Sequence, residues 1–379
     1  MGPFSPDSVE AAQMAEYRAL TVRHLKVEEA LDALARIGSP AHSESIVALV
    51  GPTGVGKSLL MRRFIEHVNK SYAAEMAADC AMVPAVVIEL PTPIAGDFNW
   101  KDTGIRIISA FDEPLISKKI IPKLQAELDG DVIATPSRLV AEELRRAVKN
   151  CVRNRKTKVL ALDEASSLFR ARSASRHFLQ LDLVKSLSND IKIPLILAST
   201  YDLLNRENFH GQLLRRTEVI HLGRYLPDEL SRGDDYGASF RDTVYTLLNG
   251  LPVPWDNSLL KHPDYFLMKC LGCVGILKKW LMLSLEQALI DRKPVNADLL
   301  DKTAYENYKL VTMLEEAQAG ERLLADITAD ELARKLGFSQ VPSPVLQTNG
   351  LSKDAEKRST KRKKPGVRNP SRDKVGADL

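Results

Sequence analysis

The segment GPTGVGKSL carries residue types that together bind phosphate groups. Gly51, Gly56, Lys57 and Ser58 match the pattern G-x-x-x-x-G-K-[ST] without departure. Glycines let backbone N–H groups turn toward an anion, the lysine supplies positive charge to phosphate oxygens, and the hydroxyl can bind Mg²⁺. We therefore predict a site for ATP and Mg²⁺ that contains Gly51, Pro52, Thr53, Gly54, Val55, Gly56, Lys57, Ser58 and Leu59.

An acidic pair follows a short apolar run in the segment VLALDEAS. Asp163 would emerge at the end of a buried strand, where its carboxylate can join Ser58 in holding Mg²⁺. Glu164 is our candidate for the base that polarises an attacking water. The alternative is an acidic pair that only ends a strand. Because a water-activating glutamate serves hydrolysis, the pair disfavours a small-molecule kinase and predicts an ATPase.

Two further polar segments complete the candidate catalytic set. The run LILAST ends in Ser199 and Thr200, either of which could lie near the γ-phosphate as a polar sensor. The segment QLLRRTEVIHL contains Arg215 and Arg216, and one of them could stabilise transition-state charge in the nucleotide site of a neighbouring subunit. The alternative for the two arginines is a solvated basic pair.

These residues need a scaffold of buried strands and covering helices. Apolar runs at 45–51, 82–90, 158–164, 193–200 and 217–222 alternate with helical segments, which predicts an α/β fold with a five-stranded parallel sheet. Residues 9–37 show helical periodicity. We expect an N-terminal helical segment at 1–42, a nucleotide-binding domain at 43–225, a helical lid with C-terminal helices at 226–338, and a disordered basic tail at 339–379.

Composition limits the class of protein further. The chain has 379 residues, of which 44% are hydrophobic and 27% charged, as in soluble globular proteins. No apolar run reaches the ~18 residues of a membrane span, and the N-terminus lacks the layout of a signal peptide. We therefore expect a cytoplasmic protein without a membrane partner. Cys270 and Cys273 form a single C-x-x-C with no second ligand pair, which favours buried thiols over a zinc site.

The order of the motifs resembles that of the AAA+ ATPases over about residues 40–290. The block DEASSLFRARSASRHFLQLDLVKSLSNDIKIPLILAST is similar to the TnsC/TniB regulators of transposition, as is the segment VIELPTP after the second strand. Two features depart from the AAA+ pattern. Ser199 or Thr200 stands where asparagine is frequent, and the segment LGCVGILKKW offers Lys278 or Lys279 in place of a lid arginine. The missing arginine is consistent with slow, regulatory hydrolysis.

The resemblance implies an ATP-dependent protein that forms a ring or helical filament on double-stranded DNA. It also implies that the protein links a target-selecting protein to a transposase, and that ATP hydrolysis disassembles the oligomer. Sequence-independent DNA contacts require basic side chains. The candidates, each with a solvated surface as its alternative, are Lys118, Lys119, Lys123, Arg170, Arg172 and Arg176.

The net positive charge of the chain comes from its last 29 residues. Residues 351–379 carry ten Lys or Arg and four Asp or Glu, a net charge of +6, so the other residues sum to −2 within the total of +4. The tail could bind DNA or dock a partner protein. Two other functions stay open: a replication initiator or helicase loader, which a winged-helix domain after the lid would favour, and a signalling NTPase that acts without DNA.

Overall fold

The computed structural model describes residues 4–5, 8–37, 45–93, 98–111, 137–169, 174–204, 216–338 and 341, with the backbone alone at 137–141 and 174–179. The chain divides into two compact units, Met1–Ala325 and Asp326–Leu379. The first unit contains the sheet and all but one of the described helices. The second contains α17, which spans Ala329–Lys335.

A five-stranded parallel sheet forms the centre of the first unit and confirms the predicted fold class. The strands are β1 (Ile46–Val50), β2 (Ala85–Glu89), β3 (Val159–Asp163), β4 (Leu195–Ser199) and β5 (Thr217–His221), in the order β2-β3-β4-β1-β5. Each lies within or at the edge of an apolar run seen in the sequence. Every residue of β1 and β4 is buried, as expected of central strands covered on both faces.

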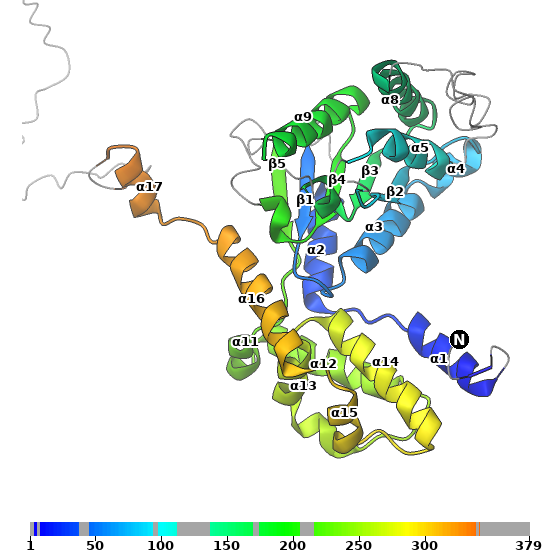
Figure 1. Cartoon of the computed structure of the whole chain (residues 1–379), viewed down its shortest axis with the longest axis vertical. Coiled ribbons are helices and arrows are strands. Elements are labelled where there is room, and N and C mark those ends of the chain that lie inside the picture. The colour runs from blue at the N-terminus through cyan, green and yellow to red at the C-terminus, as the bar shows by residue number, and fades with distance from the viewer. Residues whose placement is uncertain are drawn as a thin grey trace, which may run out of the picture. The chain divides into compact units, whose positions relative to one another are not determined.

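Helices cover the two faces of the sheet (Figure 1). Val47 and Leu49 face α2 (Leu25–Arg36) and α3 (Lys57–Ser71), together with the helices that follow the sheet. Ile46, Ala48 and Val50 face the other side, where the core is built from α5 (Trp100–Ala110), α8 (Ser137–Asn154) and α9 (Ala174–Ile191). The alternation along β1 therefore divides the apolar core into two layers.

The N-terminal periodic run is two helices rather than one. α1 (Val9–Ala19) ends at Leu20, and α2 begins after His24. The Lys278 ammonium donates hydrogen bonds to the carbonyls of Arg18 and Leu20, both at 2.6 Å, and so satisfies acceptors that the end of α1 leaves open. The first helix packs against α14 and the second against α3. The break lets each helix reach its own partner.

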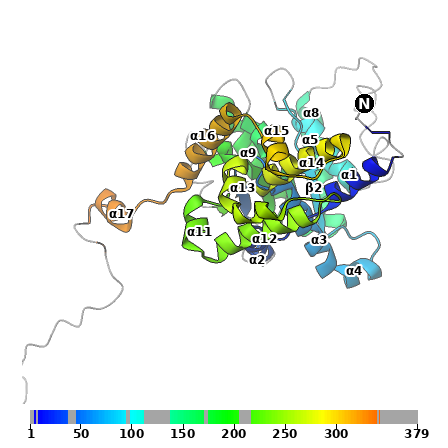
Figure 2. The same ribbon diagram turned by 90° about the horizontal axis from the view of Figure 1, so that it is seen from below.

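A helical region follows the sheet and is seen from below in Figure 2. It contains α11 (Pro227–Arg232), α12 (Asp235–Asn249), α13 (Pro263–Cys270), α14 (Val274–Asp291) and α15 (Ala297–Thr303), and α16 (Asn307–Leu324) continues from it. Its core is aromatic: Phe240, Phe266 and Trp280 are fully buried, and the Trp280 indole N–H donates to the Leu300 carbonyl at 3.0 Å. None of the described helices is both long and apolar enough to cross a membrane.

Candidate functional site

The predicted phosphate loop connects β1 to α3, as a phosphate-binding loop requires. Gly54 and Gly56 take the left-handed backbone conformation, with φ of 77° and 115°, which favours glycine at both positions. A Cβ added to Gly56 would meet no heavy atom within 4 Å, so open space lies beside the first turn of α3. This concave loop at a helix N-terminus fits an anion such as a nucleotide phosphate.

Gly51 and Val55 support the loop from behind. A Cβ on Gly51 would lie 2.3 Å from the carbonyl oxygen of Leu222, so only glycine allows the chain after β5 to pass this close. Val55 is 2% exposed and belongs to the apolar core. The other seven predicted loop residues line a cavity of about 930 Å³: Pro52, Thr53, Gly54, Gly56, Lys57, Ser58 and Leu59.

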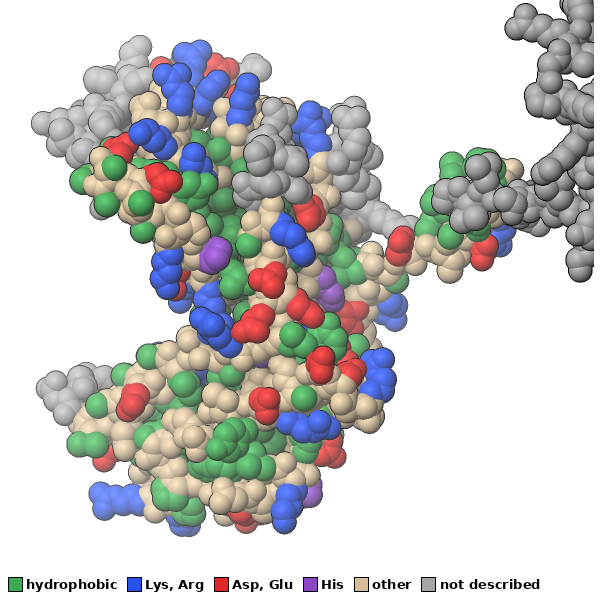
Figure 3. Space-filling view, turned by 180° about the vertical axis from the view of Figure 1, so that it is seen from behind, with side chains coloured by type: hydrophobic (Ala, Val, Ile, Leu, Met, Phe, Trp, Pro, Cys, Tyr) green, Lys and Arg blue, Asp and Glu red, His purple; other side chains and the backbone are tan. Residues whose placement is uncertain are grey.

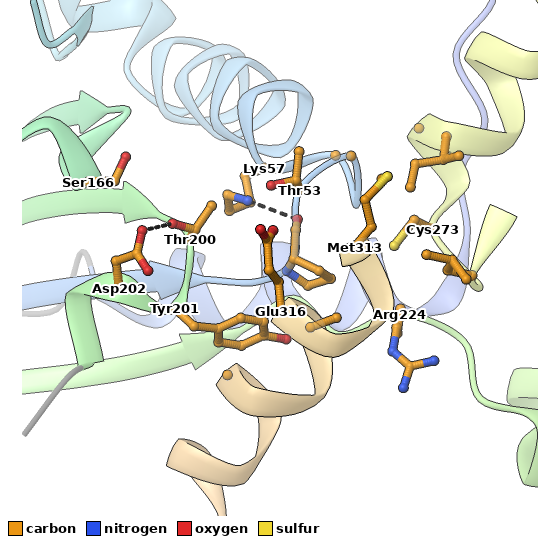
Figure 4. A pocket seen from close by; sticks show the side chains of 18 of the residues that line it. Thr53, Lys57, Ser166, Thr200, Tyr201, Asp202, Arg224, Cys273, Met313 and Glu316 are labelled. Carbon is orange, nitrogen blue, oxygen red and sulfur yellow. Dashed lines mark hydrogen bonds between the residues drawn. The ribbon is translucent and has the colours of Figure 1, made fainter. Parts of the chain in front are cut away.

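Lys57 supplies the positive charge of the loop. Its ammonium donates hydrogen bonds to the carbonyls of Gly51 at 2.8 Å and Pro52 at 3.0 Å, as Figure 4 shows in part. Burial lowers the pKa of Lys57, because a charged amine loses solvation there, and the nearby carboxylates of Glu164 and Asp163 act against that shift. The acidic pair and the phosphate loop are therefore electrostatic neighbours.

The acidic pair reaches the loop because β3 and β1 are parallel and separated only by β4. Asp163 ends β3, and its Oδ1 accepts a hydrogen bond from the backbone N–H of Glu164 at 2.9 Å. Glu164 lines the cavity and has a φ of 55°, a conformation that is uncommon outside glycine and tends to occur at functional sites. The side chains of Ser58 and Asp163 carry oxygen atoms of the kind that Mg²⁺ prefers, so these two residues would hold the ion together with phosphates and water.

The end of β4 contributes the next polar group. Thr200 lines the cavity, and its hydroxyl bonds with Asp202 Oδ2 at 3.1 Å (Figure 4). The other sensor candidate, Ser199, is 1% exposed, and its buried hydroxyl has no hydrogen-bond partner among the described residues. The Tyr201 side chain also lines the cavity, and its hydroxyl lies 2.8 Å from His221 Nε2. Of the two sensor candidates, Thr200 is the one that faces the cavity.

The cavity also contains residues that our sequence reasoning did not place there. Arg224 lies three residues beyond β5, is 8% exposed, and lines the cavity. Its Nε and Nη2 donate to the two carboxylate oxygens of Glu321 on α16, at 2.7 and 3.0 Å. The signal in the sequence was available: β5 adjoins the phosphate-loop strand, so a basic residue just after β5 would lie near the loop.

The lid helix α14 closes one end of the cavity through backbone contact. A Cβ on Gly275 would lie 2.4 Å from the Gly54 carbonyl oxygen, and one on Gly54 would lie 2.6 Å from the Ile276 side chain. The two glycines allow α14 to touch the phosphate loop directly. Lys278 caps α1 instead of facing the phosphates, and Lys279 does not line the cavity. The lid therefore contributes shape rather than a cation.

Arg216 lies at the other end of β5 from the phosphate loop. It immediately precedes Thr217, whereas His221, at the end of the strand, pairs with Val50. Arg216 and the end of β5 at His221 are therefore about 16 Å apart, the length of five residues at ~3.3 Å each. The Arg216 Nη1 donates to Asn189 Oδ1 at 2.6 Å within its own chain. Arg216 is therefore too far from its own cavity to act there, and Arg215 lies outside the described residues.

Five of the six predicted DNA contacts lie outside the described residues: Lys118, Lys119, Lys123, Arg170 and Arg172. The sixth, Arg176, belongs to α9, where the structure gives the backbone alone.

A basic stripe that we did not predict lies on α8. Arg146, Lys149 and Arg153 recur at helical spacing and are all exposed. On the face of the molecule drawn in Figure 3, blue basic side chains gather at the top and red acidic ones across the middle. On this face, basic and acidic side chains therefore gather in different areas.

The C-x-x-C motif is structural. Cys270 and Cys273 are 0% and 2% exposed within the apolar core, and burial raises the pKa of the Cys273 thiol to about 12 and that of Cys270 further still. Neutral thiols of this kind pack as small apolar groups. No cluster of three metal-ligating His, Cys, Asp or Glu side chains occurs in the described part of the chain. The structure agrees with the expected buried thiols.

The chain was compared with protein families, curated proteins and solved structures. Residues 41–207 match a family described as an AAA domain. None of the curated proteins compared with the chain matches it. Similar solved structures include the ORC2 protein of Aeropyrum pernix (16% identity, 84% of this chain and 73% of that chain covered, TM-score 0.46) and domain III of the replication initiation protein DnaA of Thermotoga maritima (11%, 79% and 95%, 0.41). Another is the Drosophila ORC bound to DNA (18%, 82% and 71%, 0.38).

Sheet order, phosphate loop and acidic pair together define the class of protein: it has the AAA+ P-loop NTPase fold. The AAA-domain match covers the phosphate loop, the acidic pair and the end of β4. The solved structures resemble the chain only distantly.

Proposed function

We propose that the protein is an AAA+ ATPase that regulates DNA transposition. It would oligomerise on double-stranded DNA with ATP bound, connect a target-selecting protein to a transposase, and leave the DNA after hydrolysis. The observation that carries the hydrolytic part is the placement of Glu164 in the same cavity as Lys57 and Ser58. A carboxylate beside a phosphate loop can act on water, which a nucleotide-binding site without hydrolysis does not need.

In this proposal each residue of the site has a separate role in hydrolysis. Lys57 contacts β- and γ-phosphate oxygens, giving up its present bonds to two loop carbonyls. The Ser58 hydroxyl and the Asp163 carboxylate would hold Mg²⁺, which would offset charge on the phosphates. Glu164 orients a water for in-line attack and accepts its proton, and Thr200 fixes the orientation of a γ-phosphate oxygen or that water.

The site is completed by a second copy of the chain in this proposal. Arg216 lies at the end of β5 that is far from its own cavity, so a role for it in catalysis requires a neighbouring subunit. An arginine that enters from a neighbour stabilises charge in the transition state and makes hydrolysis depend on assembly. Arg215 is the alternative donor of this contact.

The DNA and transposition parts of the proposal rest on sequence. The post-acidic block and the VIELPTP segment resemble the TnsC/TniB regulators, and the basic segments near 118–123 and 170–176 could bind phosphates. The stripe on α8, composed of Arg146, Lys149 and Arg153, adds a described basic surface. Contacts of this kind give affinity without sequence preference and weaken steeply as salt rises.

Electron microscopy of the purified protein tests the proposal. We expect rings or filaments on double-stranded DNA with a non-hydrolysable ATP analogue, and none with ADP. Stimulation of transposase-catalysed strand transfer in the presence of ATP would then separate a transposition regulator from a replication initiator or helicase loader of the same fold. Nucleotide-dependent oligomers that ignore DNA would indicate a signalling NTPase, and a chain that stays monomeric with ATP and DNA would refute the proposal.

A further inference from the structure

Helix α16 lies across the cavity from the phosphate loop. Six of its residues line the cavity, more than any other helix supplies: Met313, Glu316, Ala317, Ala319, Gly320 and Leu323. In Figure 4 the Met313 and Glu316 side chains of this helix extend toward the loop near Thr53 and Lys57. The helix that follows the lid region is therefore one wall of the nucleotide site.

One glycine determines how closely α16 docks. A Cβ added to Gly320 would lie 2.0 Å from Cδ2 of the Tyr201 ring, far inside normal contact distance. Glycine is otherwise unfavourable in the middle of a helix, by roughly 1 kcal/mol relative to alanine. Gly320 and Ala317 are both buried. The docking surface is the segment directly after Thr200, so α16 rests on the γ-phosphate end of the site.

The acidic side chains of α16 near the cavity carry the same sign of charge as a nucleotide and would repel it. Lys57 and Arg224 are the basic residues that line the cavity within the described chain. Arg224 is held by both carboxylate oxygens of Glu321, and the Glu316 carboxylate points toward the phosphate loop (Figure 4). A triphosphate brought into the cavity would meet the Glu316 carboxylate of α16 and would compete with Glu321 for the Arg224 guanidinium.

We propose that α16 is a removable cover of the nucleotide site, latched by the Arg224–Glu321 ion pair, and that ATP binding and α16 docking compete. The inference rests on the proposed nucleotide-binding function. Like charges disfavour the occupied, covered state, and a bidentate carboxylate–guanidinium pair at the edge of a core favours the covered one. Binding of ATP would thereby release α16, the helix at the end of the first compact unit.

Two changes to α16 release the cover by different means. Glu321→Gln keeps the size of the side chain and removes the charge that holds Arg224. Gly320→Ala strengthens the helix but places a methyl group against the Tyr201 ring. Glu315→Gln is the matched control, because Glu315 lies on the same helix, is exposed and does not line the cavity. All three are made in the full chain.

Stopped-flow binding of a fluorescent ATP analogue with Mg²⁺ gives the first measurement. We expect the association rate constant to rise about tenfold in Glu321→Gln and Gly320→Ala, the change that ~1.4 kcal/mol of latch energy would produce. Glu315→Gln should bind as the wild type does. Unchanged association in both α16 variants would overturn the proposal.

Hydrogen–deuterium exchange of the peptide covering 307–324 gives the second measurement. Without nucleotide, its amides should exchange faster in Glu321→Gln than in the wild type, which tests the latch even if ATP does not bind. With a non-hydrolysable analogue, wild-type α16 should also exchange faster. Equal or slower exchange would mean that α16 stays as a fixed wall and that the cover does not open. A wild type that binds no analogue would instead refute the nucleotide site itself.

Discussion

Replacement of Glu164 by glutamine separates nucleotide binding from hydrolysis. The change removes one charge and the ability to accept a proton while keeping the size of the side chain, and glutamine can occupy the same cavity position after β3. Loss of a positioned general base slows a reaction by about 10²- to 10⁴-fold. At ~1.4 kcal/mol per tenfold, this corresponds to about 3–5 kcal/mol of transition-state stabilisation.

The same change should leave ATP binding intact or slightly stronger. Glu164 is an electrostatic neighbour of Lys57 and partly offsets its charge, so its neutralisation leaves the ammonium more available to phosphate oxygens. Single-turnover hydrolysis and equilibrium binding, both measured with the assembled protein, report the two effects separately. A hydrolysis rate within about threefold of the wild type would refute the role of Glu164 as base. A rate lowered only in proportion to lost binding would refute it as well.

Three further changes probe the phosphate loop, the subunit contact and the fold. Lys57→Ala should weaken ATP binding by about 100-fold or more, because two charge-assisted contacts of ~1.5–3 kcal/mol each are lost; equilibrium binding that stays within tenfold would exclude Lys57 as the phosphate contact. Arg216→Ala should lower the ATPase of the assembled protein at unchanged ATP affinity, and mixing it with Glu164→Gln subunits should restore activity at mixed interfaces; if neither it nor Arg215→Ala lowers the ATPase, the contribution in trans is wrong. Burial lowers the pKa of His24 to about 4, so between pH 6.5 and 4 the unfolded chain binds a proton that the folded chain excludes. Stability must then fall as pH falls, by about 2 kcal/mol more from pH 7 to pH 5 in the wild type than in His24→Phe; equal losses in urea denaturation would contradict the assigned burial.

The strands and the phosphate loop were predictable because their signals are local. Five short apolar runs gave the five strands, and parallel connection by helices followed from their alternation. The pattern from Gly51 to Ser58 and the pair at 163–164 each depend on neighbours within eight residues. Parallel strands then place their carboxyl ends at one edge of the sheet, which brings Lys57 and Glu164 together without further information.

The helices around the site were less predictable because their roles depend on distant contacts. The periodic run at 9–37 concealed a break, since the first half packs on α14 and the second on α3. From the sequence alone, Gly320 would be expected only to destabilise its helix. The structure shows that a larger residue there would collide with the Tyr201 ring, 119 positions earlier in the chain. Glu321 likewise acquires its role only from Arg224, 97 positions away. Hydrophobic periodicity reports only on neighbours within a few turns, so it cannot reveal contacts between residues about 100 positions apart.

The second basic residue of the cavity in the structure is not the one that the sequence of the lid suggests. The segment LGCVGILKKW directs attention to Lys278, which follows Gly275 by three positions. In the structure Lys278 is used by the carbonyls at the end of α1, while the cavity obtains its second cation from Arg224 on the sheet side. A cation on the lid would draw the lid toward the phosphates, whereas a cation on the sheet leaves the lid position insensitive to them. In our proposal, sensing of the nucleotide then passes through Glu321 of α16, which holds the Arg224 guanidinium.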